Sequence, residues 1–209
     1  MPKKEAQIET LKHYLPGGAY DAILNYLRQY NVHLTISAKR KSILGDYRHR
    51  THYRNHRISV NGNLNTYSFL ITLLHELAHL LTFEEFSNKV QPHGREWKLV
   101  YAKLLEHFIA SKIFPPEIEQ KLLRSLSNPA ASSCADVELL RILKKYDNEK
   151  SCCILLEELP LSALFLIDGG RIFKKGEKLR KRFKCKEIKT EKEYLFSPVS
   201  EVELVSRES

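Results

Sequence analysis

Residues 75–79, with the pattern His-Glu-x-x-His, are the part of the sequence whose spacing suggests chemistry. On a helix, residues four apart lie on one face, so His75 and His79 are placed to bind one metal ion together. Zinc held by three protein ligands makes water acidic enough for a nearby carboxylate to take its proton during attack on a carbonyl. The motif therefore predicts a catalytic zinc site for amide hydrolysis, with Glu76 as the general base.

A strongly apolar stretch surrounds this motif. It runs from Thr66 to about Phe83, is rich in leucine, and begins after Asn65, which like Thr66 is a suitable helix cap. We expect a central, largely buried helix here. Histidines and a glutamate are costly to bury in such a helix unless a metal ion or other partners satisfy them. The apolar context therefore favours the metal-binding interpretation.

The third ligand has to come from farther along the chain. The metzincin pattern fails, because Thr82 and Glu85 stand where that pattern requires glycine and histidine. We predict His93, which lies 14 positions after the motif at an expected junction between a loop and a helix. Glu96 and Glu106 are the alternatives, because a gluzincin-like site takes a glutamate from the following helix.

The other predicted helices and strands indicate an α+β fold. We expect helices over 6–14, 20–30, 95–110, 116–126 and 136–146, and strands over 32–36, 45–54 and 57–61. After Pro160, short segments at 163–167, 171–174, 180–188 and 194–205 predict a small β module. We therefore expect a metallopeptidase domain over 1–127, a helical linker over 128–160, and a small basic β-rich module over 161–209.

Two runs resemble the SprT-like (Spartan-related) zinc metallopeptidases: HELAH at residues 75–79 and HGREW at residues 93–97. LGDY at 44–47 and ISVN at 58–61 also look like the strands before that family's active-site helix. The resemblance covers residues 6–110. It implies a minigluzincin-like α+β fold with a small three-stranded sheet, one zinc ion per chain held by His75, His79 and His93, and catalysis by Glu76. It also suggests DNA-bound or crosslinked proteins as substrates.

The cysteines depart from that family's usual pattern. Many relatives carry a Cys-rich zinc ribbon after the protease domain, whereas this chain has no C-x-x-C pair. We expect reduced thiols that act as small buried hydrophobic residues, with a second metal site as the alternative. The four are Cys134, Cys152, Cys153 and Cys185.

The formal charge of +9 and the pI of about 9.3 favour an anionic partner, with nucleic acid as the main candidate. Residues 171–192 contain 11 Lys or Arg against three Glu, and the predicted strand over 45–54 places several arginines on one face. A solvated surface is the alternative for both. The candidate DNA-binding residues are Arg48, Arg50, Arg54, Lys174, Lys175, Arg180, Lys181, Arg182 and Lys184.

Composition limits the class of protein. No apolar run approaches the roughly 18 residues that a membrane span needs, and no secretory leader is apparent, so we expect a cytoplasmic protein without a membrane partner. The prediction is a zinc endopeptidase acting on protein substrates. The alternatives are a nucleic-acid-binding protein with a structural or idle zinc site and a hydrolase of other substrates. Tyr47, Tyr53 and Arg95 are open candidates for stabilising an oxyanion.

Overall fold

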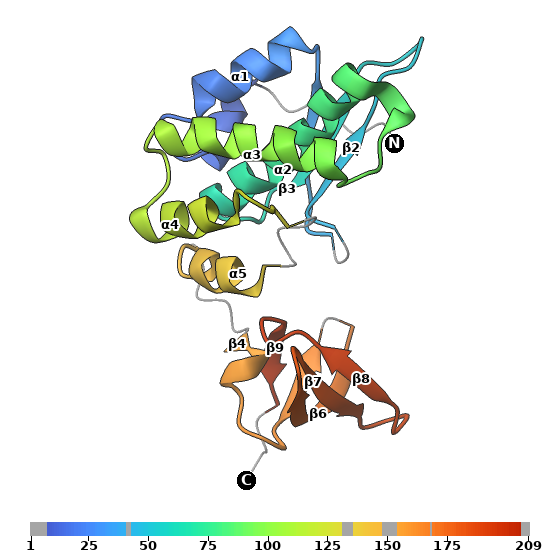
Figure 1. Ribbon diagram of the computed structural model, residues 1–209. Helices are drawn as coiled ribbons and strands as arrows, with labels where there is room; N and C mark the ends of the chain where they lie inside the picture. The colour runs from blue at the N-terminus through green and yellow to red at the C-terminus, as the bar shows by residue number, and fades with distance from the viewer. Residues whose placement is uncertain (1–7, 41–42, 131–135, 148–153, 168, 206–209) are drawn as a thin grey trace. The chain divides into compact units, whose positions relative to one another are not determined.

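The computed structural model describes residues 8–40, 43–130, 136–147, 154–167 and 169–205. The chain divides into two compact units, Met1–Asp147 and Asn148–Ser209 (Figure 1). This division corrects the predicted boundaries at 127 and 160, because the expected linker is not a separate part. Its helix α5 (Val137–Lys144) contributes Leu139 and Leu143 to the core of the first unit. Its strand β4 (Ile154–Leu155) pairs within the second unit.

The first unit contains a three-stranded sheet with the strand order β1-β3-β2. Strand β1 (His33–Ser37) is parallel to the central strand β3 (Arg57–Asn61), and β2 (Gly45–Arg48) is antiparallel to it. The predicted strand over 45–54 is therefore too long. Arg48 pairs with Arg57, the first residue of β3, so the edge strand has no partner beyond this point. Thr51 and Arg54 instead bridge to each other in a local turn.

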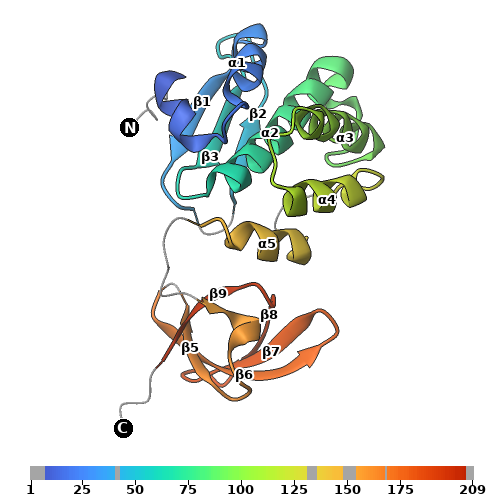
Figure 2. The ribbon, with the colours of Figure 1, turned by 90° about the vertical axis from the view of Figure 1, so that its left-hand side faces the viewer.

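Helices cover this sheet in layers. The 3-10 helix η1 (Ile8–Tyr14) and α1 (Tyr20–Gln29) precede it, and the long helix α2 (Thr66–Phe86) follows it. Figure 2 shows α2 between the sheet and α3 (Arg95–Ala110), and α4 (Pro116–Ser125) packs against α3. The short 3-10 helix η2 (Ser87–Lys89) joins α2 to the loop before α3. Apart from η1, which is 3-10 and not α-helical, the predicted helices are confirmed within a few residues.

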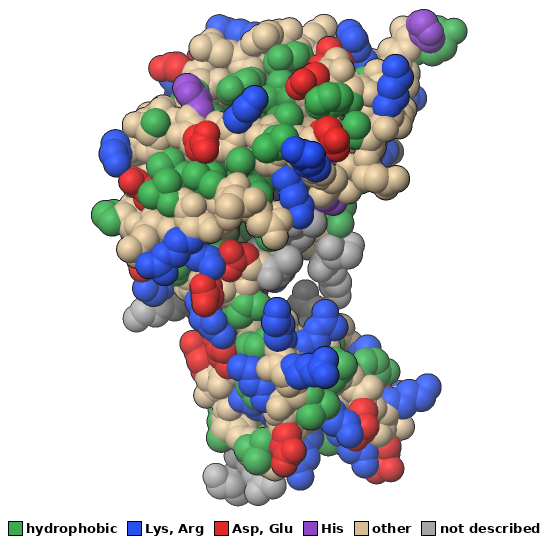
Figure 3. Space-filling view, viewed as in Figure 1, with side chains coloured by type: hydrophobic (Ala, Val, Ile, Leu, Met, Phe, Trp, Pro, Cys, Tyr) green, Lys and Arg blue, Asp and Glu red, His purple; other side chains and the backbone are tan. Residues whose placement is uncertain are grey.

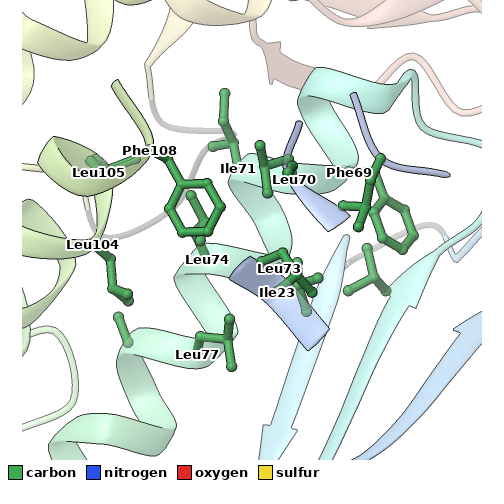
Figure 4. Close-up of a cluster of buried hydrophobic side chains, with 14 of the residues drawn as sticks. Ile23, Phe69, Leu70, Ile71, Leu73, Leu74, Leu77, Leu104, Leu105 and Phe108 are labelled. Carbon is green, nitrogen blue, oxygen red and sulfur yellow. The ribbon is translucent and has the colours of Figure 1, made fainter. Parts of the chain in front are cut away.

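Helix α2 is the central element because it is apolar on nearly every side. Phe69, Leu73 and Leu77 are completely buried, and Figure 4 shows them packed with side chains of α1 and α3. Asn65 caps the helix as expected: its side chain accepts a hydrogen bond from the Ser68 amide at 2.9 Å. Such burial on all sides fixes the helix rigidly, so polar groups on it are held in defined positions.

The Asn65 side chain also ties α5 to this helix. Its amide donates to the Leu143 carbonyl at 2.9 Å and to Asp147 Oδ1 at 2.7 Å.

Among the described residues, no helix is both long and apolar enough to cross a bilayer.

The second unit is a six-stranded sheet with the order β4-β9-β5-β6-β7-β8. Phe165, Phe173 and Val202 form its core together with Leu156 of the 3-10 helix η4 (Leu156–Glu158). The predicted segment 194–205 is two strands, separated by a turn that contains Pro198. The further strands are β5 (Leu164–Ile167), β6 (Arg171–Leu179), β7 (Arg182–Glu187), β8 (Glu193–Phe196) and β9 (Glu201–Leu204). The α+β class and the small β module are thus confirmed.

Candidate metal centre

Three histidine side chains converge in the first unit, two from α2 and one from the loop before α3. The Nε2 atom of His75 lies 3.2 Å from Nε2 of His79 and 3.2 Å from Nε2 of His93. Two nitrogens bound to one tetrahedral zinc at about 2.0–2.1 Å are roughly 3.3 Å apart. The spacing of the imidazoles therefore fits a shared zinc ion.

His93 is presented by a tight turn. Its backbone has φ of 58°, a left-handed conformation that is uncommon outside glycine. The amide of Gly94 donates to the carbonyl of Gln91 at 2.9 Å, and α3 begins at the next residue. The structure thus brings the predicted third histidine to the other two. Neither Glu96 nor Glu106 joins the group of possible ligands.

Burial keeps these imidazoles neutral. Burial, together with the nearby histidines, lowers the pKa of His75 to about 3 and that of His79 to about 4. The pKa of His93 is also lowered, again by burial. A neutral imidazole has a free lone pair for a metal ion, so at neutral pH no proton has to leave before metal binds.

Aromatic side chains of α3 form one wall of the site. Trp97 is almost fully buried, and its ring lies 4.7 Å from both the His75 and the His93 rings. Tyr101 stacks behind it at 4.9 Å. The Trp97 indole N–H is buried without a hydrogen-bond partner in the described part of the chain. Trp97 is therefore a core residue of α3 that also packs against two of the imidazoles.

Glu76 lies on α2 directly against the edge strand β2. Its side chain is buried, and a Cβ atom at Gly45 would contact the carboxylate and stand 2.8 Å from both Glu76 Cγ and Thr72 Cγ2. Only glycine leaves room for this carboxylate. Burial, and to a smaller extent Asp46, raise the pKa of Glu76 to about 8, although Arg40 acts in the opposite direction. A dication held by the histidines would favour the ionised form.

Arg40 holds the chain that leads into β2. Its guanidinium donates to Asn61 Oδ1 at 2.7 Å, to Ser59 Oγ at 2.9 Å and to the Leu44 carbonyl at 3.1 Å. These bonds fasten the residue before Gly45 to the central strand. No sequence pattern indicates this role, because Arg40 looks like any other member of a short basic run.

Tyr47 links the site to a buried polar chain. Its hydroxyl shares a 2.9 Å hydrogen bond with Nδ1 of His56, whose Nε2 lies 3.2 Å from Glu84 Oε1. The Tyr47 ring is parallel to that of His79 at 6.3 Å. Burial and the charge of Glu84 raise the pKa of Tyr47, so it stays protonated. Of the other two candidates for oxyanion binding, Tyr53 is 96% exposed and Arg95 starts α3 beside His93.

The arginines predicted to form a basic stripe do not share a strand face, because β2 ends at Arg48. Arg48 pairs with Asp46 at 3.0 Å, and Arg50 pairs with Glu84 at 3.2 Å. Arg54 is exposed in the turn that follows. Two of the three positive charges are therefore already matched by a carboxylate.

In the second unit one predicted DNA-binding residue is misassigned. Lys175 is only 5% exposed, and its ammonium group donates to the carbonyls of Glu157 at 3.2 Å and Leu159 at 2.5 Å. Successive side chains of a strand point to opposite faces, so Lys175 points into the core while Lys174 points into solvent. The others are exposed: Lys174, Arg180, Lys181, Arg182 and Lys184.

Of the four cysteines, Cys134, Cys152 and Cys153 lie outside the described residues. Cys185 is a buried free thiol in the core of the second unit, which matches the expected structural role.

Comparison with known proteins agrees with the site. The SprT-like family model matches residues 19–120, which include all three histidines and Glu76. This segment is thus similar to the SprT-like family. Protein SprT of Glaesserella parasuis serovar 5 (strain SH0165) is 33% identical over 82 residues, which cover 37% of this chain and 52% of that relative. Protein SprT of Pseudomonas fluorescens (strain Pf0-1) is 44% identical over 43 residues, which cover 20% of this chain and 26% of that relative.

The chain spans about half the length of the first of these relatives and about a quarter of the second. No solved structure matches the chain.

Proposed function

We propose that this chain is a zinc-dependent metallopeptidase that hydrolyses peptide bonds of protein substrates and binds one zinc ion per chain. The observation that carries the proposal is the meeting of three imidazoles: Nε2 of His75 lies 3.2 Å from Nε2 of His79 and 3.2 Å from Nε2 of His93, next to the buried carboxylate of Glu76. Three nitrogen ligands leave the fourth tetrahedral position open, as catalytic zinc sites require.

The residues of the site have different roles in amide hydrolysis. A zinc ion, when bound, supplies Lewis acidity that makes water more acidic and a carbonyl more electrophilic. Glu76 accepts the proton of the attacking water and returns it to the leaving nitrogen. Gly45 leaves the carboxylate room to do so, and Arg40 keeps the neighbouring strand in place. Trp97 excludes water from one side of the imidazoles.

Cleavage of casein and histones by the full chain tests this proposal. We expect proteolysis that a chelator abolishes and that added Zn²⁺ restores. Bound zinc without cleavage of any protein would favour a structural or idle site. Zinc-dependent hydrolysis of small amides alone would favour a hydrolase of other substrates.

We also propose that the second unit binds nucleic acid, which would direct cleavage to DNA-bound or crosslinked proteins. The specific observation is that Lys174 and Lys186 lie directly opposite each other on β6 and β7, with Glu191 pairing with Lys186 at 3.2 Å and no ion pair at Lys174 among the described residues. Like charges directly opposite each other destabilise a sheet, so an anion that binds between them would relieve the repulsion. Figure 3 shows basic side chains gathered on the visible face of this unit.

The salt dependence of binding tests this second proposal. Single-stranded DNA should bind the full chain with an affinity that falls steeply with salt, as measured by fluorescence anisotropy. Lys174→Ala and Lys186→Ala should each lower the slope of log K against log salt by about 0.7, the value for one phosphate contact on a single strand. Lys103→Ala, an exposed position on α3, is the matched control. Equal slopes in all four proteins would contradict the proposal.

A further inference from the structure

A pocket of about 380 Å³ lies directly beside the metal centre. It is formed by the first turns of α3 and the chain that follows α4, and the residues that matter here are His93, Arg95, Lys98, Leu99, Leu126 and Pro129. His93 belongs to both the pocket and the metal centre. A group bound in the pocket would therefore lie next to the bond that is cut. The volume is at the small end of the range of about 300–1,000 Å³ for ligand sites, which suits one or two side chains.

The charges of the pocket are positive. Arg95 and Lys98 line it, and no acidic side chain of the described residues does. The Lys98 ammonium donates to Asn128 Oδ1 at 2.7 Å, a neutral partner that leaves two further protons to donate. Arg95 is exposed, and within the described chain it has no hydrogen bond or ion pair. Glu96 is nearby but is not part of the lining. Figure 3 shows basic side chains in the region where α3 begins.

The other walls are apolar. Leu99 is 55% exposed, although it is a large hydrophobic residue, and Leu126 and Pro129 flank it. Apolar walls suit the methylene groups of a long side chain, and the cations suit a carboxylate at its end. The combination matches glutamate better than a lysine, which the two cations would repel, or a purely apolar residue, which would leave them without a partner.

We infer that this pocket binds an acidic side chain of the substrate next to the scissile peptide bond, so that cleavage favours sites flanked by glutamate or aspartate. The inference rests on the proposed peptidase function for its position in the reaction. The pocket itself needs only its own residues to bind an acidic peptide, so binding and cleavage can be tested separately.

Charge-reversed variants provide the test. In Arg95→Glu the new carboxylate stands in the first turn of α3, where the helix dipole favours it, so the variant should fold. Lys98→Glu is the second variant, and Lys103→Glu on the outside of the same helix is the matched control. Unfolding curves and zinc content should be the same for all of them as for the unaltered chain.

Two readouts separate the pocket from the peptidase. In peptide libraries, kcat/KM should be at least about 10-fold higher with Glu than with Lys at one position flanking the cut. Arg95→Glu and Lys98→Glu should abolish or invert this preference, and Lys103→Glu should keep it. In calorimetry on the metal-free chain, the peptide acetyl-Ala-Glu-Ala-amide should bind more tightly than its Ala-Lys-Ala counterpart, with the same response to the variants.

The possible outcomes have distinct meanings. Cleavage that shows no acidic preference, or a preference that is unchanged by both reversals, would overturn the inference while leaving the peptidase intact. No cleavage but selective binding of the acidic peptide would support the pocket and reject the peptidase. Neither cleavage nor selective binding would reject both.

Discussion

Polar side chains are buried at the metal centre of the first unit, whereas the charges of the second unit lie mostly on its surface. His75 and Glu76 lie on a helix that is apolar on nearly all sides, and burial lowers the pKa of His75 and raises that of Glu76. Lys174 and Lys184 point into solvent from a small sheet. Groups of the first kind are prepared for chemistry, because desolvation and fixed geometry change their reactivity. Groups of the second kind attract a partner weakly and through a screened charge.

Lys175 shows that position, and not residue type, makes this difference. It is one residue away from exposed Lys174, yet it is enclosed by the two carbonyls that it contacts and lies 4.3 Å from the ring of Phe183. A lysine in this setting stabilises the module instead of binding a partner. The comparison between the two units therefore gives predictions for buried and exposed groups alike.

The largest expected effect is on metal binding. His93→Ala removes one of three ligands, and the affinity for zinc should fall by more than about 100-fold, since even the loss of outer hydrogen-bond partners costs roughly 10–100-fold. Competition with a chromophoric chelator measures this. His52→Ala, an exposed histidine outside the group, is the control and should bind zinc normally. Equal affinities would contradict the assignment of His93.

Gly45→Ala should come next. The added Cβ would displace the Glu76 side chain, and a shift of about 1 Å in a catalytic group costs about 100-fold in rate. Zinc affinity should change by no more than a few-fold, because the histidines are untouched. Gly17→Ala is a matched control, since a Cβ there would meet no atom within 4 Å. A normal kcat in Gly45→Ala would show that Glu76 does not need this space.

The pH dependence of stability in the metal-free chain gives the third prediction. Glu76 has a folded pKa of about 8 against an ordinary value of 4.5, so the folded state keeps a proton that the unfolded state releases. Its stabilising effect is complete below pH 4.5 and is lost as the pH rises through 8. Glu76→Gln should therefore stabilise the chain at pH 9, by roughly 2–4 kcal/mol at about 1.4 kcal/mol per pKa unit.

At pH 5 the glutamine variant and the unaltered chain should be about equally stable, because both carry a neutral side chain there. Urea unfolding at the two pH values measures the difference. A difference that is the same at both would mean that Glu76 is not buried as a neutral acid.

The smallest effect should appear in the second unit. Lys175→Met leaves the carbonyls of Glu157 and Leu159 without their donor and should cost about 1–3 kcal/mol of unfolding free energy. Lys174→Met removes only an exposed charge and should change stability by less than about 0.5 kcal/mol. Urea unfolding should be followed by circular dichroism and not by tryptophan fluorescence, because the single tryptophan, Trp97, lies in the first unit. Equal costs would remove the distinction between the two lysines.

Local patterns made much of this fold predictable. The cap at Asn65 and the bounds of α3 follow from residues close together in the sequence, and they agree with the structure. Strand lengths were predicted less well. The break expected near Gly176 is a bulge within β6, where the glycine allows close approach of the Lys184 carbonyl. A glycine in a strand looks the same in sequence whether it ends the strand or bends it.

The candidate site shows the same limit. The two histidines of α2 were evident because their spacing is local, and His93 was preferred over two glutamates from its place before a helix. The roles of Arg40 and Gly45 depend on contacts with residues far away in the sequence, to Asn61 and Glu76 respectively. No local pattern indicates such contacts. The inward turn of Lys175 likewise depends on the register of a sheet.

The most direct test of the account compares the full chain with Glu76→Gln for zinc content and for casein cleavage in the same preparation. We expect one zinc ion per chain in both proteins and a loss of about 10²–10⁴-fold in kcat/KM for the variant, the usual contribution of a general base. Cleavage that survives in Glu76→Gln, or a full-length chain that binds no zinc, would contradict it.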